Sequence, residues 1–335
     1  MAQAKPSQTK PLTVRTAGQT VAAVVRTARP ELSWTDAKKL VAKRQVSVNG
    51  NLCTDDARRL NVGDLLVIGA TARSKGLDER EIRIRHLDDD LIVVEKPAGV
   101  TSTRHAEERD WSDRRRQVQP TLDELLKPLV ASQVGKMRLD TSPTMLSDAI
   151  KAASRNKAIR LPGVIAVHRL DRETSGLMVF ARNRACELKL ISMFAQHRVD
   201  RRYRAVVLGD CPDMIIDTHL AKVGEQRRSV PKSTSGAQHA VTHVTRVAKH
   251  GGYTMIECKL ETGRTHQIRI HLAERGHSVC GDKIYRCDIP DKSDPPRHAL
   301  HAYSIAFEHP VTAKAIQFEM EFPRDLAAWM KPFGF

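Results

Sequence analysis

The sequence predicts an α+β fold built on a mixed, mostly antiparallel sheet flanked by helices and loops. Apolar runs rich in Val, Ile and Leu indicate strands at residues 91–99, 176–182, 202–209 and 253–261. Helical patterns occur at residues 120–131, 186–197 and 265–276. Strands and helices do not alternate regularly, as they would in a doubly wound parallel sheet, so an α+β domain fits the pattern better.

The size and charge of the chain indicate two domains and a polyanionic partner. Its 335 residues suffice for one large and one small domain. A net charge of +16 and a pI near 9.8 point to nucleic acid first and to an anionic membrane surface second. The longest apolar runs are far shorter than the roughly 20 residues of a membrane helix. The first residues lack an apolar signal core, so we expect a cytoplasmic protein without membrane association.

The cysteines and histidines do not suggest a metal site. The six cysteines form no Cys-x-x-Cys pair, and the histidines near them do not complete a zinc spacing. His266 and His271 lie five residues apart, which is off the i,i+4 spacing of a helical metal pair. We therefore expect reduced thiols and no bound metal.

A small N-terminal α+β unit is expected over residues 16–71, after a polar, disordered lead-in at residues 1–15. Ser33 is the expected N-cap of its second helix. The elements follow in the order helix 18–28, helix 33–45, a hairpin turn at Asn49-Gly50 and a second turn at Gly63-Asp64. The charged residues 72–85 are expected to form a linker.

This order of helix, helix, hairpin and turn resembles the S4 RNA-binding domain. In that family the second helix and the hairpin present basic side chains to folded RNA. The resemblance implies RNA contacts by Lys38, Lys39, Lys43 and Arg44. Taken alone, these charges are also typical of a solvated helix face.

The nine residues HRLDRETSG, at 168–176, raise a chemical question because they place five ionisable side chains between two apolar runs. An aspartate there is costly to ionise without a cationic partner. A guanidinium would keep Asp171 ionised, and a shielded carboxylate can act as nucleophile or general base. Candidate partners are Arg169 and Arg172 nearby and the arginines of residues 263–271. A salt-bridged polar turn is the alternative interpretation.

Several further blocks, in order, resemble the RluA/RluD group of ribosomal pseudouridine synthases. They are DDDLIVVEKPAGV, HRLDRETSGLMVFAR, RRYRAVVLG, TGRTHQIRIHLAERGHSVCGDKIY and LHAYSIAFEHPVT, and they cover most of residues 86–325. An S4 domain in front is the arrangement of many members. The resemblance implies the pseudouridine synthase fold over residues 86–335 and an enzyme that isomerises selected uridines in RNA. It implies neither a metal nor an organic cofactor.

The resemblance also implies roles for individual residues. Asp171 matches the catalytic aspartate, which acts as nucleophile or as the base of a glycal route. Tyr203 matches the tyrosine that stacks on the base near its C5 atom, and Arg269 matches the basic residue that pairs with the aspartate. Ile268 would form an apolar wall beside the uracil.

Other arginines of these blocks are assigned to substrate binding. Arg169 and Arg172 are expected to contact phosphates or to brace the loop, and Arg264 is the alternative partner of the aspartate. His168 is expected to order the loop. Glu173 stands where the family more often has Asp, which we expect to be harmless.

Two surface insertions, residues 103–119 and 132–162, leave the RNA target open. Large-subunit ribosomal RNA is the first choice and transfer RNA the second. The rival hypotheses are a catalytically silent RNA-binding or ribosome-assembly factor and, much more weakly, a glycoside hydrolase, which would need two carboxylates at a defined separation. The protein is expected to be a monomer.

Overall fold

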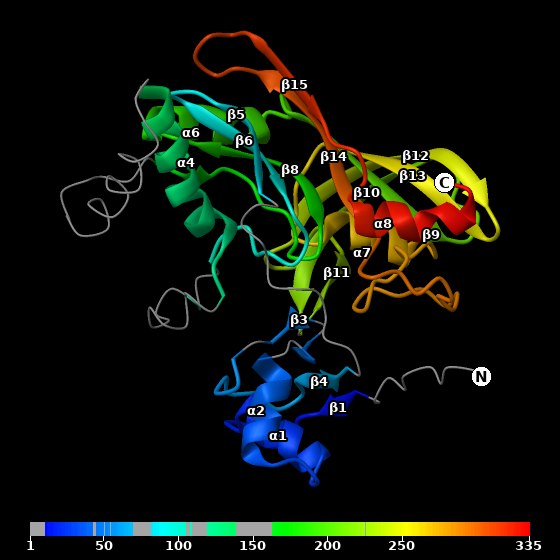
Figure 1. Ribbon diagram of the computed structural model, residues 1–335. Helices are drawn as coiled ribbons and strands as arrows, with labels where there is room; N and C mark the ends of the chain where they lie inside the picture. Colours follow the sequence, from blue (N-terminus) through cyan, green and yellow to red (C-terminus); the bar gives the residue numbers. More distant parts are fainter. Residues whose placement is uncertain are drawn as a thin grey trace. The chain divides into compact units, whose positions relative to one another are not determined.

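The structure is a computed structural model that describes residues 11–42, 45–49, 51–53, 55–69, 82–104, 108, 119–138, 163–224 and 226–335. Contacts divide the chain into two compact units (Figure 1), and residues 82–104 and 121–335 belong to the larger one. Within the described ranges, no helix is long and apolar enough to cross a membrane.

The N-terminal unit consists of two helices and a small antiparallel sheet. Its sheet has the strand order β1-β4-β2-β3. The elements are β1 (Leu12–Thr13), α1 (Val21–Ala28), α2 (Trp34–Ala42), β2 (Val46–Val48), β3 (Asn51–Leu52) and β4 (Leu65–Ile68). Ser33 caps α2 as expected, because its hydroxyl accepts a hydrogen bond of 3.1 Å from the Asp36 amide. Apolar residues of both helices and of the sheet form one buried core.

Strand β1 corrects the expected extent of the lead-in. Leu12 and Thr13 pair with Leu66 and Leu65, so the ordered unit begins before residue 16. Residues 1–10 lie outside the described part of the chain. Of the expected hairpin turn, Asn49 is described with a φ of 51°, in the left-handed region that such a turn requires, whereas Gly50 is not described.

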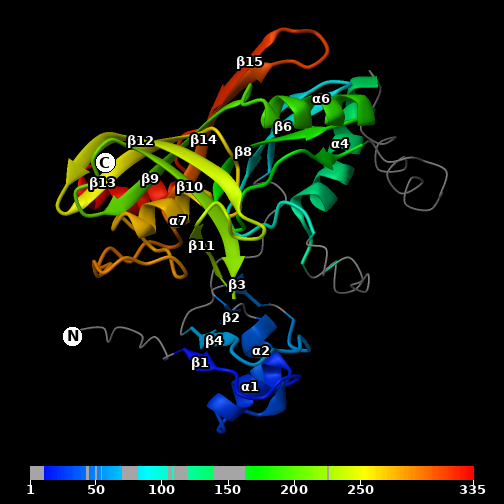
Figure 2. The same ribbon diagram turned by 180° about the vertical axis from the view of Figure 1, so that it is seen from behind.

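The larger unit is built around one eleven-stranded, mostly antiparallel sheet (Figure 2). Its order is β11-β10-β12-β13-β9-β14-β8-β6-β5, with β15 paired to β14 and β7 to β8. The strands are β5 (Arg83–Leu87), β6 (Leu91–Lys96), β7 (Ile165–Ala166), β8 (Ser175–Ala181), β9 (Asp200–Leu208), β10 (Met214–Val223), β11 (Gln226–Val230), β12 (Gln238–His250), β13 (Tyr253–Leu260), β14 (Leu300–Glu308) and β15 (Ala315–Glu319). The α+β fold class with a mostly antiparallel sheet is therefore confirmed.

Helices pack on both halves of this sheet. They are α4 (Leu122–Arg138), α6 (Arg184–Ala195), α7 (Gln267–Glu274) and α8 (Arg324–Met330), followed by the short helix η3 (Lys331–Phe333). Helix α6 lies beside β8 and shares a buried apolar cluster with β6, β8 and β14. Helix α7 packs on β10 and β12 through Ile270, which shares a buried apolar cluster with Leu220 and Ala240. The sheet thus carries α7 on one half and α6 on the other.

Two further expected boundaries differ in the structure. Strand β5 begins at Arg83, because it pairs with β6, so the larger unit starts within the expected linker of residues 72–85. Helix α4 continues to Arg138, so the first seven residues of the expected insertion 132–162 are helical. Residues 139–162 lie outside the described chain, as does most of the insertion 103–119.

The junction of β8 with β14 places the HRLDRETSG segment. It is the one parallel pairing among the described strands. Gly176, the last residue of the segment, has a φ of 136°, and a Cβ atom there would lie 2.3 Å from the Ala302 carbonyl oxygen. Only glycine permits this close approach of two backbones. The loop before β8 therefore ends beside β14, next to β9.

Candidate active site

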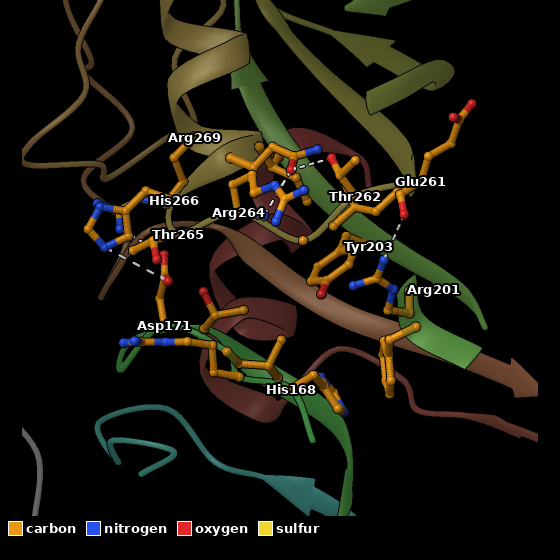
Figure 3. A pocket seen from close by; sticks show the side chains of 18 of the residues that line it. His168, Asp171, Arg201, Tyr203, Glu261, Thr262, Arg264, Thr265, His266 and Arg269 are labelled. Carbon is orange, nitrogen blue, oxygen red and sulfur yellow. Dashed lines mark hydrogen bonds and ion pairs between the residues drawn. The ribbon is translucent and has the colours of Figure 1, made fainter. Parts of the chain in front are cut away.

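A pocket of about 370 Å³ opens at the HRLDRETSG loop (Figure 3). Most of its wall comes from three segments: the loop around Asp171, strand β9, and residues 260–269 at the start of α7. The end of α6 and Leu300 of β14 complete it. The volume falls within the range of about 300–1,000 Å³ that is usual for small-molecule sites. The pocket therefore has room for a flat ring and part of a sugar.

Asp171 lies at one end of this pocket and contacts a guanidinium. Its Oδ2 accepts a hydrogen bond of 2.9 Å from Nη1 of Arg269, and its Oδ1 lies 3.8 Å from Nε2 of His266. The Asp171 side chain retains 17% of its exposure, so one side of the carboxylate still faces the pocket. The sequence left the arginine partner of Asp171 open. In the structure Arg269, 98 residues away in sequence, makes this contact.

Arg269 is itself held by a second, fully buried carboxylate. Its Nε and Nη2 donate to the two oxygens of Asp282 at 2.6 and 2.9 Å. Asp282 also accepts the backbone N–H groups of Ile284 and Tyr285. Because a bidentate pair fixes the plane of the guanidinium, Asp282 determines which Arg269 nitrogen faces Asp171.

The electrostatics of this group favour an ionised Asp171. Burial works to raise the pKa of the Asp171 carboxyl, but the neighbouring His266, Arg269 and His298 together outweigh burial and lower that pKa below the ordinary value. Arg269 is the permanent charge among them, because its carboxylate partners raise the already high pKa of its guanidinium. Asp171 is therefore a shielded carboxylate that stays charged at neutral pH.

His266 lines the pocket next to Asp171. It precedes α7 in a left-handed conformation, with a φ of 60°. Its Nδ1 lies 2.8 Å from the Tyr285 hydroxyl. Burial lowers the pKa of His266, although the Asp171 charge opposes this effect. The neutral ring therefore has one nitrogen at Tyr285 and the other near the carboxylate.

A buried lysine anchors the loop that carries Asp171. Lys96 is fully buried, and its Nζ donates to the carbonyls of Pro97, Arg172 and Thr174 at 3.0, 3.0 and 2.7 Å. Burial lowers the pKa of Lys96 to about 7. Its three acceptors match the three donors of an ammonium group. Arg172 adds to this anchor, because its Nε donates to the Gly99 carbonyl at 3.0 Å.

The C-terminal part of the chain supports the same loop from the other side. Arg297 donates to the Glu173 carbonyl at 2.9 Å and to the Ser175 hydroxyl at 2.9 Å. Asp325, at the start of α8, orients this guanidinium at 2.7 Å. His298 lies 2.8 Å from the Thr174 hydroxyl. The Asp171 loop is thus fixed on two sides by buried polar groups.

Tyr203 and Ile268 line the pocket beyond Asp171. Tyr203 projects from β9 with 7% exposure and Ile268 from the start of α7 with 4% exposure. The Tyr203 hydroxyl has no hydrogen-bond partner among the described residues, and Figure 3 shows it facing into the pocket. Burial raises the pKa of Tyr203, so the phenol stays protonated. These side chains offer a flat, apolar contact surface.

The remaining expected residues differ in their positions. Arg169 and Arg264 line the pocket, and Arg264 donates to the His239 carbonyl at 2.9 Å. His168 accepts a hydrogen bond of 2.9 Å from the Val179 amide, so its ring is neutral and fixes the loop to β8. In the N-terminal unit, Lys38 and Lys39 are exposed on α2, whereas Lys43 and Arg44 lie outside the described residues.

One cluster of the described residues has the composition of a metal site, namely His86, Asp88 and His309. The Nδ1 of His309 accepts the backbone N–H groups of Val311 and Thr312, so its proton is on Nε2. That nitrogen donates to Asp88 at 3.0 Å. A protonated nitrogen cannot ligate a metal, so these contacts describe a structural hydrogen-bond cluster.

Comparisons with known proteins agree on one family. The family model for RNA pseudouridylate synthase matches residues 90–274. The chain belongs to the RNA pseudouridine synthase family. It is an RNA-modifying isomerase, and its similarity to several ribosomal large subunit pseudouridine synthases is near 30% identity.

Two relatives illustrate this similarity. Ribosomal large subunit pseudouridine synthase D of Zymomonas mobilis is 32% identical over 253 residues, which cover 73% of this chain and 70% of that protein. An uncharacterized RNA pseudouridine synthase of Mycobacterium bovis is 32% identical over 313 residues and covers 90% of both chains. Among solved structures, human RNA pseudouridylate synthase domain containing 4 has a TM-score of 0.52 at 19% identity, over 75% of this chain and 92% of that one. This structural likeness confirms the fold of the synthase unit.

Sequence reasoning missed several groups of this candidate site. Asp282 and Arg201 lie inside the family-like blocks, but nothing in their spacing signals a pairing or a pocket position. Lys96 lies within the expected strand run of residues 91–99. A basic residue within an otherwise apolar strand run was the available signal for its burial.

Replacing Lys96 with methionine tests the anchor of the loop. Lys96→Met keeps the volume but leaves three buried carbonyls without a donor, so we expect the free energy of unfolding to fall by about 3 kcal/mol. Urea denaturation of the full chain measures this change. Lys189→Met is the control, since Lys189 donates to one exposed carbonyl and should change stability by less than about 0.5 kcal/mol. Equal effects of the two variants would contradict the anchoring role.

Proposed function

We propose that this chain converts a specific uridine of large-subunit ribosomal RNA to pseudouridine, with Asp171 as the catalytic carboxylate. The observation that carries the proposal is the buried Asp171–Arg269–Asp282 arrangement at the end of a base-sized pocket. The family membership supplies the reaction. The similarity to ribosomal large subunit pseudouridine synthases supports the choice of RNA.

The reaction needs an ionised carboxylate at the ribose. The N1–C1′ bond breaks, the uracil turns, and C5 bonds to C1′, after which the C5 proton leaves and N1 gains a proton. A carboxylate can bond to C1′ or remove the C2′ proton, and both routes require the charged form. Arg269 stabilises the ionised form of Asp171, and Asp282 holds the Arg269 guanidinium in place. No step of this scheme requires a metal or an organic cofactor.

The walls of the pocket suit a flipped uracil. The base must leave its stack to reach a carboxylate inside the protein. Tyr203 offers a ring for stacking and Ile268 an apolar contact, and the exclusion of water strengthens the field between Asp171 and Arg269. Arg169 and Arg172, which lie on the same loop as Asp171, are proposed to bind phosphates of the flipped nucleotide.

The N-terminal unit, which begins with β1, is proposed to be an S4-like RNA-binding domain. Its two helices, small sheet and exposed Lys38 and Lys39 on α2 support this assignment. The net charge of +16 supports a polyanionic substrate. We propose a cytoplasmic location, because ribosomal RNA is modified where it is made. A monomer remains the expected oligomeric state.

Mapping pseudouridines in total RNA tests both the activity and the target. Cells that lack the gene should lose pseudouridine at one or a few ribosomal RNA positions, and the wild-type gene should restore it. Asp171→Asn should restore none, because an amide can neither attack C1′ nor take a proton. Asp210→Asn, which removes an exposed carboxylate just after β9, serves as the matched control and should restore the modification.

The alternative hypothesis, a catalytically silent RNA-binding or ribosome-assembly factor, predicts a different result for the same strains. If Asp171→Asn protein restored growth and ribosome assembly as well as wild type while forming no pseudouridine, RNA binding would be the main role. Loss of sites in transfer RNA alone would contradict the ribosomal target. Restoration of pseudouridine by Asp171→Asn would contradict the catalytic assignment.

The pH dependence of the rate tests the role of Arg269. Removing Arg269 alone would leave Asp282 buried and unpaired, so the double variant Arg269→Gln/Asp282→Asn is used. Loss of the guanidinium removes one of the groups that lower the pKa of Asp171, so that pKa rises and the ionised fraction at low pH falls. We expect a rate loss on the order of 100-fold at neutral pH, growing as the pH falls.

Single-turnover release of tritium from transcripts labelled at uridine C5 gives this pH profile. The acid limb of the double variant should lie at higher pH than that of the wild type. Melting temperatures report whether the variant remains folded. An acid limb at the same pH as in the wild type would show that Arg269 does not control the charge of Asp171.

A further inference from the structure

Arg201 is a buried cation that lines the pocket without a counter-charge. It projects from β9 on the same face as Tyr203, two residues along the strand, and only 7% of it is exposed. Within the described chain it makes no ion pair, and its Nε is buried without a hydrogen-bond partner. Burying a guanidinium without an ion-pair partner is costly, so Arg201 is expected to lower the stability of the folded protein.

The protein partners of Arg201 leave part of its guanidinium unused. Nη2 donates to the Glu261 carbonyl at 3.1 Å, and the group lies 5.2 Å from the centre of the Phe194 ring. The Glu261 carboxylate does not serve it, because that group binds His243 at 2.6 Å. Nη1 has no partner in the described residues and lies against Gly263, where a Cβ atom would approach it to 2.6 Å. The absence of a side chain at Gly263 thus leaves room for the Arg201 guanidinium.

The position of Arg201 relative to Asp171 suggests what it binds. Figure 3 shows Tyr203 between Asp171 and Arg201, so the two charged groups lie at opposite ends of the aromatic contact surface. A uracil with its ribose at Asp171 and its ring on Tyr203 directs the opposite edge toward Arg201. In uridine, the carbonyl opposite N1 is C4=O4. A guanidinium only donates hydrogen bonds, and O4 only accepts them.

We propose that Arg201 holds the uracil carbonyl that points away from the ribose, which is O4 before the base turns and O2 afterwards. The proposal rests on the function proposed above. A half-turn of uracil about its N3–C6 axis exchanges N1 with C5 and O4 with O2. One fixed donor can therefore hold the base in both orientations, while the carbon–nitrogen bond is replaced by a carbon–carbon bond at the other end.

The same contact selects uracil over cytosine. Cytosine carries an amino group at C4, so it would present donors to the donors of Arg201. An unpaired donor in a buried site rejects a base more strongly than a missing apolar contact does. Arg201 is thus a specificity-determining residue that touches the substrate but does not exchange a proton with it.

Arg201→Met is the first test, with Arg202→Met as its matched control. Arg202 precedes Tyr203 on β9, faces the other side of the sheet and pairs with Asp200 and Glu257. Single-turnover tritium release is measured on a transcript that contains the mapped uridine. We expect Arg201→Met to slow the reaction on the order of 30-fold and Arg202→Met to change it less than threefold. RNA affinity should change less than threefold in both.

Two further readouts separate substrate contact from a structural role. Replacing an unpaired buried cation with methionine should leave the melting temperature unchanged or higher, whereas a structural arginine would lower it. With 4-thiouridine at the target position, the wild type should slow about tenfold, because sulfur accepts weakly. The Arg201→Met enzyme should show no additional loss with this analogue, since the contact is already absent.

Each alternative result overturns the proposal. A wild-type rate for Arg201→Met, an undiminished 4-thiouridine effect in that variant, or a loss of RNA affinity with an unchanged rate would each exclude a carbonyl contact; the last would indicate a phosphate contact instead. Failure of the proposed function is separate, because the wild-type enzyme would then release no tritium from any transcript.

Discussion

The ion pair between Asp171 and Arg269 is the interaction on which the rest of the site depends. A carboxylate inside a protein stays charged only if the cost of burial is offset nearby. Arg269 provides that offset at 2.9 Å, and Asp282 prevents the guanidinium from turning away. The two carboxylates have different environments, since Asp282 is fully buried and Asp171 keeps one side open to the pocket. Of these two carboxylates, only Asp171 is therefore accessible from the pocket.

The fold supplies this geometry through positions that are far apart in sequence. Asp171 comes from the loop before β8, Tyr203 from β9 and Arg269 from α7, and the order of strands in the sheet brings them to one pocket. Lys96 and Arg297 fix the loop through its backbone carbonyls, so the carboxylate is presented on a rigid support. Such a support suits a reaction in which the base moves while the ribose and the carboxylate keep their places.

Much of the fold could be predicted from the sequence, because strands rich in β-branched residues and amphipathic helices leave local patterns. The ends of the helices were harder to predict. Helix α4 continues through Pro128 to Arg138, and α7 begins at Gln267, whose buried amide binds Val241 and Thr242. The site was predictable only where family-like blocks marked it. The bonds of Asp282, Lys96 and Arg201 depend on tertiary packing over long sequence separations, and no local spacing encodes them.

The central claim is that Asp171 is held in its ionised form, and its titration tests this most directly. Protein labelled with ¹³C at aspartate carboxyls is titrated by NMR, and the signal missing in Asp171→Asn is assigned to Asp171. The account predicts a midpoint below the ordinary value of 3.8, with the carboxyl ionised throughout the neutral range. A midpoint above that value would mean that burial outweighs Arg269 and the neighbouring histidines, and it would contradict the account.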